Sequence, residues 1–206
     1  MIVADFRDKK IEVLNSTIWE NKALRPRIDE WLLNFNTDEE REYALYLLSQ
    51  LMYFSSSNIR NLLKTLYRDL YRYPVIERIR KGNSDTLDEG FIESEFNKEL
   101  LQTRFLGVGN PSESGVHLLY YFRQENKIPK SLFVNTDDVI ERQNDGSVSL
   151  RSDFQNATRF VFIDDICGSG QQATNDTNVK RCVADLRRIK PDAQISYLML
   201  FGLSAG

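Results

Sequence analysis

Residues 160–173 read FVFIDDICGSGQQA, an apolar run followed by two acids and a loop of small residues. Aromatic and β-branched residues over 159–163 predict a buried strand, and helical periodicity over 171–189 predicts a helix after the loop. Because open parallel sheets bind ligands at the carboxyl ends of their strands, the acids and the loop stand where a ligand site is expected.

The residue types in this stretch suit a sugar phosphate. Gly168 and Gly170 allow backbone N–H groups to close around an anion, and the start of the following helix adds its positive end. Asp164 and Asp165 would repel a phosphate placed against them, but they can accept hydrogen bonds from vicinal hydroxyls such as those of a ribose. The pattern therefore predicts a sugar 5-phosphate held at both of its ends.

The surrounding sequence alternates short apolar strands with helices from residue 104 onward. The expected strands cover residues 104–108, 131–134, 159–163 and 195–203, and the expected helices cover 115–125 and 171–189. Residues 141–158 are polar, show no helical period and contain the turn signal Asn144-Asp145-Gly146, which predicts an irregular loop. Strand and helix alternation with continuously apolar strands predicts an α/β fold with a parallel sheet flanked by helices.

Residues 1–103 read as an all-helical N-terminal region. Thr37 and Glu40 have the spacing of a capping box, which predicts a helix start near residue 38. Pro26 and Pro74 suit first helical turns, and breaks are expected at residues 55–57, with a serine cap, and at 82–84. The expected domains are a helical region over 1–103 and an α/β domain over 104–206.

Composition excludes several classes of protein. The 206 residues carry 27 Lys and Arg against 30 Asp and Glu, a net charge of −3, which argues against bulk binding to nucleic acid or anionic membrane. No apolar run reaches the roughly 18–20 residues of a spanning helix, and the N-terminus is not a secretory signal. Two cysteines without an export signal predict free thiols in the cytoplasm. A single histidine excludes a His-rich metal site, and we expect no metal held by the protein alone.

The strand, acid pair and small-residue loop resemble the PRPP-binding motif of type I phosphoribosyltransferases. The resemblance implies that Asp164 and Asp165 are the catalytic acids that take the ribose 2- and 3-hydroxyls, with Mg²⁺ bound mainly through PRPP. It further implies a 5-phosphate loop made of Cys167, Gly168, Ser169, Gly170, Gln171 and Gln172. The family usually has Thr-Thr-Gly-Gly-Thr here, so Gln171 replaces its second glycine and Gln172 its terminal hydroxyl residue.

Two further segments fit the same family. The stretch after the strand over 104–108 matches the place of its pyrophosphate loop, which implies roles for Gly109, Asn110, Ser112, Glu113, Ser114 and Gly115. Residues 141–158 match its mobile lid, in which Arg142 and Arg151 are the only basic residues. The resemblance covers roughly residues 104–203 and is greatest to a divergent bacterial branch with a helical N-terminal extension, of the kind associated with prokaryotic antiviral systems.

Other interpretations of the same residues stay open. The acid pair could belong to a plain strand-to-helix turn, and Gly168 to Ala173 also fit the dinucleotide pattern G-x-G-x-x-A. That pattern needs an acid at the end of the next strand, where Leu200-Phe201-Gly202 stand, and a P-loop would need a lysine after Gly170. Cys167 is either a filler or a thiol of lowered pKa. His117 reads as a packing or capping residue.

The sequence supports two functions. The first is an enzyme that transfers a phosphoribosyl group from PRPP to an unknown acceptor and releases pyrophosphate; the intact acid pair favours it. The second is a non-catalytic module that senses PRPP or a nucleotide, or interacts with another protein; Gln171, Gln172 and the few basic residues over 141–158 favour it. Because the chain stops just after an apolar strand, we expect a truncated product, a homo-oligomer or a partner protein that completes the acceptor site.

Overall fold

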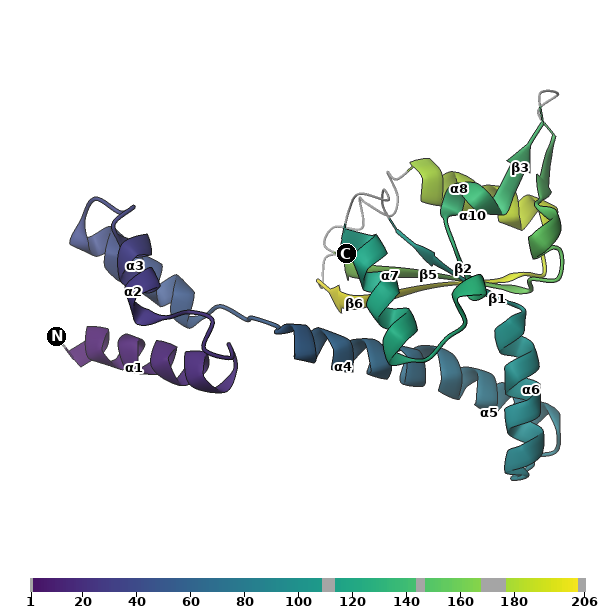
Figure 1. Cartoon of the computed structure of the whole chain (residues 1–206), viewed down its shortest axis with the longest axis horizontal. Coiled ribbons are helices and arrows are strands. Elements are labelled where there is room, and N and C mark those ends of the chain that lie inside the picture. The colour runs from purple at the N-terminus through teal and green to yellow at the C-terminus, as the bar shows by residue number, and fades with distance from the viewer. Residues whose placement is uncertain (1, 109–113, 144–146, 168–176, 204–206) are drawn as a thin grey trace. The chain divides into compact units, whose positions relative to one another are not determined.

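The computed structural model of the chain describes residues 2–108, 114–143, 147–167 and 177–203 (Figure 1). The chain divides into two units, residues 1–59 and residues 60–206. The first unit is helical, and the second combines helices with a parallel sheet. The predicted α/β fold is confirmed. No helix in the part of the chain that the structure describes is long and apolar enough to cross a membrane.

The first unit contains α1 (Ile2–Thr17), α2 (Arg25–Leu32) and α3 (Asp38–Ser49). Helix α3 begins at the predicted capping box: the Glu40 N–H donates to Thr37 Oγ1 at 3.2 Å, and the Thr37 N–H donates to Glu40 Oε2 at 3.1 Å. Proline also stands in the first turn of α2, as predicted. A small core holds these helices together, formed by Ile11, Trp19 and Ile28.

Three helical segments follow one another directly between residues 56 and 82: α4 (Ser56–Tyr67), the π-helical η1 (Arg68–Arg72) and α5 (Tyr73–Gly82). The predicted serine cap is Ser55, whose hydroxyl accepts a hydrogen bond from the Asn58 N–H at 3.2 Å. Pro74 lies in the first turn of α5, as predicted, where it has no N–H to donate to the preceding turn. The next helix is α6 (Glu89–Leu101), which begins after the predicted break.

The sheet over the described residues contains β1 (Thr103–Gly107), β2 (Phe133–Val134), β5 (Arg159–Cys167) and β6 (Gln194–Gly202). Their order is β2-β1-β5-β6, and every neighbouring pair is parallel. Helix α7 (Ser114–Glu125) and the 3-10 turn η2 (Lys130–Leu132) lie between β1 and β2 in the chain, and α10 (Thr177–Ile189) lies between β5 and β6. These elements follow the predicted alternation of strand and helix.

Both faces of the sheet are covered by helices. Alternate residues of each strand point to opposite faces, so each strand has side chains in both layers of packing. On one face, the Phe105 ring lies 5.6 Å from the ring of Phe122 in α7 and 5.2 Å from that of Tyr71 in η1. On the other, Phe160 and Phe162 pack in one buried cluster with Val179, Cys182 and Leu186 of α10. Burial on both faces explains why the strands read as continuous apolar runs.

The predicted irregular loop over 141–158 is wrong in part. The structure has the short helix α8 (Thr136–Val139), then an antiparallel hairpin of β3 (Ile140–Arg142) and β4 (Val148–Leu150), and the 3-10 turn η3 (Ser152–Phe154). Ile140 and Leu150 pair across the hairpin and are buried in the α10 cluster. Val148 packs against the same cluster, and so few apolar residues show no period along the sequence. The turn signal Asn144-Asp145-Gly146 lies outside the described residues.

Candidate functional site

The strand order places a topological switch point between β1 and β5, the place where open α/β sheets form a ligand-binding crevice. From β1 the chain passes through α7 to β2, which lies on one side of β1. Strand β5 lies on the other side of β1, and from β5 the chain passes through α10 to β6, farther away from β1. The connections that follow β1 and β5 therefore run in opposite directions along the sheet. Open parallel sheets bind ligands at the carboxyl ends of two such strands. Both segments that the sequence assigned to phosphate groups start at this point, one after β1 and one after β5.

Most residues of those two segments lie outside the described residues. This applies to Gly109, Asn110, Ser112 and Glu113 of the predicted pyrophosphate loop, and to Gly168, Ser169, Gly170, Gln171 and Gln172 of the predicted 5-phosphate loop. Ser114 and Gly115 begin α7, and Cys167, a free half-buried cysteine, ends β5. His117 lies in α7, but its side chain is outside the description.

The acid pair lies inside β5 rather than after it. The pairing of β1 with β5 ends at Gly107 and Ile163, and β6 continues alongside β5 from Asp164 opposite Met199 to Cys167 opposite Gly202. The predicted strand end at Ile163 is therefore wrong, because a second strand of equal length continues to bond β5. Asp164 and Asp165 occupy the part of β5 that extends past β1, at the switch point.

The two acids have different surroundings. Because successive strand residues point to opposite faces, Asp164 lies on the face that α10 covers and is 3% exposed, whereas Asp165 is half-buried. Asp164 Oδ2 accepts a hydrogen bond from the Tyr197 hydroxyl, and its Oδ1 accepts one from the Asp165 N–H at 2.9 Å. Asp164 is thus held by the protein on both oxygens. Asp165 Oδ1 accepts a hydrogen bond from the Ile166 N–H at 2.8 Å, and Asp165 is the more accessible of the two carboxylates.

Burial raises the pKa of Asp164, and the hydrogen bond from Tyr197 opposes that rise. Burial and the neighbouring Asp164 carboxylate raise the pKa of Tyr197, so the tyrosine stays protonated and remains the donor. Tyr197 is the residue that sequence reasoning missed. It lies opposite Phe162, diagonal to Asp164 on the same face, and this relation appears only once the register of β5 and β6 is known.

The two arginines of the predicted lid are both paired with acids of the protein. Arg142 Nη2 lies 2.8 Å from Asp185 Oδ2 of α10, and Arg151 Nη1 lies 3.1 Å from Asp138 Oδ1 of α8. The first pair ties the hairpin to the helix that follows the candidate site. A lid role for the hairpin therefore stays a prediction, and it requires the pair between Arg142 and Asp185 to open or to move with the hairpin.

Arg142→Gln should loosen the hairpin selectively. The ion pair with Asp185 is partly exposed, so its loss should cost at most about 1 kcal/mol of global stability. Amide exchange of Ile140–Arg142 and Val148–Leu150 should nevertheless become faster, because the pair is a direct tie to α10. Hydrogen-exchange mass spectrometry measures this, with Lys81→Gln, which breaks an exposed pair with Glu77, as the control. Equal exchange in wild type and Arg142→Gln would show that the apolar anchors alone hold the hairpin.

The donor set can be compared with the Mg²⁺ that the sequence resemblance implies. Among the described residues, no group of three or more His, Cys, Asp or Glu side chains could enclose a metal. Mg²⁺ usually keeps several waters and is bound through one or two carboxylates plus substrate phosphates. The half-buried Asp165 carboxylate fits that mode of binding, in which the ligand supplies most of the oxygens.

A covered parallel sheet with an acid pair at its switch point, followed in the sequence by a glycine-rich stretch, defines a phosphoribosyltransferase-like α/β protein. The chain belongs to the PRTase-CE family, whose family model matches residues 28–206. Comparison with the curated proteins and with the solved structures found no match. The family match starts within α2, so it includes the helices before the sheet as well as the region of the sequence resemblance.

Proposed function

We propose that this phosphoribosyltransferase-like protein binds PRPP in the crevice between β1 and β5 and transfers its phosphoribosyl group to an acceptor, with release of pyrophosphate. The observation that carries the proposal is the position of Asp164 and Asp165 on the part of β5 that extends past β1. Membership of the PRTase-CE family supports it. The acceptor is left open.

In this proposal the two acids have separate roles. The accessible Asp165 accepts hydrogen bonds from the ribose hydroxyls, whereas Asp164 is fixed by Tyr197 and positions this part of β5. The segments after β1 and β5 supply backbone N–H groups to the pyrophosphate and the 5-phosphate. Mg²⁺ would neutralise charge on the pyrophosphate as it leaves. Catalysis then rests on positioning and on negative charge near the oxocarbenium-like centre.

The second candidate function is a PRPP or nucleotide sensor without turnover. The pairing of Arg142 with Asp185 and of Arg151 with Asp138 favours it, because both basic residues of the predicted lid are already neutralised. We also propose, from the sequence resemblance, a cytoplasmic role in a bacterial antiviral system. Either function is compatible with such a role.

Pyrophosphate release distinguishes the two functions. The full chain is incubated with PRPP, Mg²⁺ and a panel of nucleobases, and PRPP binding is measured separately by calorimetry. An enzyme should release pyrophosphate with at least one acceptor, and Asp165→Asn should abolish that release. Binding without release for any acceptor would support the sensor. The absence of PRPP binding would contradict both functions.

We further propose that a second copy of the chain or a partner protein completes the acceptor site. Strand β6 is at the edge of the sheet, and its outer side pairs with no strand among the described residues. Several of its side chains are only half-buried, Ile195 and Met199 among them. Light scattering across protein concentrations tests this proposal. A strictly monomeric protein that releases pyrophosphate with a free base would contradict it.

A further inference from the structure

A pocket of about 520 Å³ lies along the edge strand β2, outside the candidate site. Strand β1 separates β2 from β5, so at the usual strand spacing the axes of β2 and β5 are about 10 Å apart, and neither acid of the pair lines the pocket. Its volume is typical of small-molecule sites. The side chains that matter for its chemistry are Tyr120, Arg123, Lys130, Phe133, Arg151 and Phe154.

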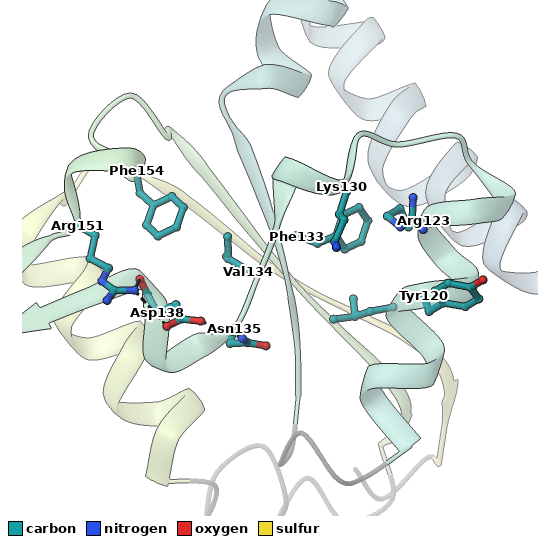
Figure 2. A pocket seen from close by; sticks show the side chains of 10 residues that line it. Tyr120, Arg123, Lys130, Phe133, Val134, Asn135, Asp138, Arg151 and Phe154 are labelled. Carbon is teal, nitrogen blue, oxygen red and sulfur yellow. Dashed lines mark hydrogen bonds and ion pairs between the residues drawn. The ribbon is translucent and has the colours of Figure 1, made fainter.

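The pocket is positively charged. Its lining carries the cations Arg123, Lys130 and Arg151 against the single acid Asp138, in a chain whose net charge is −3. Arg151 is neutralised by Asp138. Over the residues that the structure describes, no acid pairs with Arg123 or with Lys130. These two side chains lie on the same side of Val134 in Figure 2, and they make that end of the pocket positively charged.

Aromatic rings line the rest of the pocket. The Arg123 guanidinium lies 5.7 Å from the centre of the Tyr120 ring, and Phe133 is fixed by stacking on Phe105 at 5.3 Å. Figure 2 shows Phe154 across Val134 from these rings. Aromatic faces that are open to solvent stack well with planar rings such as a nucleobase. The pocket therefore combines a site for a phosphate with surfaces for a ring.

Two polar groups lie at the centre of the lining. Asn135 Nδ2 donates to Asp138 Oδ2 at 2.9 Å, so the amide and the carboxylate face each other at the carboxyl end of β2. Amide and carboxylate side chains are the groups that pair with the edges of nucleobases. The positive charge suits a phosphate, and the aromatic rings and the polar groups suit a nucleobase.

We propose that this pocket binds a mononucleotide. Arg123 and Lys130 hold its phosphate, and the aromatic side chains contact its base. The site does not use the acid pair, so the proposal goes beyond the proposed function and can stand without it. Ligand binding here would also contact α8, which carries Asp138, the partner of Arg151 at the end of β4.

AMP is the probe, titrated into the full chain by calorimetry. Adenosine and inorganic phosphate each supply half of the ligand and should bind more weakly than AMP. The double variant Arg123→Gln/Lys130→Gln should weaken AMP binding about tenfold or more, since it removes both charged donors. Because no acid pairs with either side chain among the described residues, the variant should keep the melting temperature of the wild type. Arg188→Gln, an exposed cation outside the pocket, is the control and should leave AMP affinity unchanged.

Asp165→Asn distinguishes this pocket from the crevice between β1 and β5. If the proposal is right, Asp165→Asn binds AMP as the wild type does. The proposal is wrong if Asp165→Asn loses AMP binding while the double variant keeps it, or if the wild type does not bind AMP at millimolar concentration. Inorganic phosphate binding as tightly as AMP would also overturn it, because the rings would then contribute nothing.

Discussion

Asp165→Asn should raise the dissociation constant for PRPP by roughly 10- to 100-fold. In the proposed function this half-buried carboxylate accepts hydrogen bonds from the ribose hydroxyls, and a hydrogen bond to a charged group contributes about 1.5–3 kcal/mol. Asparagine keeps the size of the side chain, so the melting temperature should hardly change. Calorimetry with PRPP and Mg²⁺ measures the effect.

Two further variants make this experiment specific. Asp192→Asn removes an exposed acid between α10 and β6 and should bind PRPP as the wild type does. The sequence resemblance places Asp164 on a ribose hydroxyl and so predicts that Asp164→Asn weakens PRPP binding by roughly 1–3 kcal/mol. Because Asp164 is buried and the Tyr197 hydroxyl already holds its Oδ2, the structure predicts a smaller loss than for Asp165→Asn. Equal PRPP affinity for wild type and Asp165→Asn would remove the ribose role of this residue.

Tyr197→Phe should destabilise the protein by about 1–3 kcal/mol at pH 7. The change removes the hydroxyl that donates to Asp164 Oδ2 and leaves a buried carboxylate oxygen without that partner. The pKa of Asp164, already raised by burial, should rise further, because the hydrogen bond that opposes the rise is lost. Urea unfolding at pH 7 measures the loss of stability.

The pH dependence of this loss tests its cause. A carboxyl whose pKa is raised in the folded state is stabilising when protonated, and this contribution is lost as the pH rises through the folded pKa. Below that pKa Asp164 is neutral, so Tyr197→Phe should cost less in acid than at pH 7. Tyr73→Phe removes an exposed hydroxyl, 54% exposed as a residue, and should have little effect at either pH. If Tyr197→Phe costs as much stability in acid as at pH 7, the loss comes from packing and not from the charge of Asp164.

Local chemistry along the chain was enough to predict most of the elements. The capping box of Thr37 and Glu40 sets the start of α3, and the Ser55 hydroxyl caps α4. Both can be predicted because each cap satisfies backbone N–H groups only a few residues away. Continuous apolar runs predicted the parallel strands, since strands covered on both faces carry no alternation. The hairpin over 140–150 was missed because the few apolar residues among those described that pack it against α10, Ile140, Val148 and Leu150, show no period in the sequence.

The sequence by itself determined which residues form the candidate site: an acid pair after an apolar run, with glycines beyond it. Only the tertiary structure decided how the two acids differ. Continued pairing with β6 keeps Asp164 and Asp165 in one strand, and a strand turns successive side chains to opposite faces. Asp164 is therefore buried against Tyr197, from a strand some thirty residues later, while Asp165 stays accessible. Register and strand order depend on contacts between distant segments, and no local pattern in the sequence contains them.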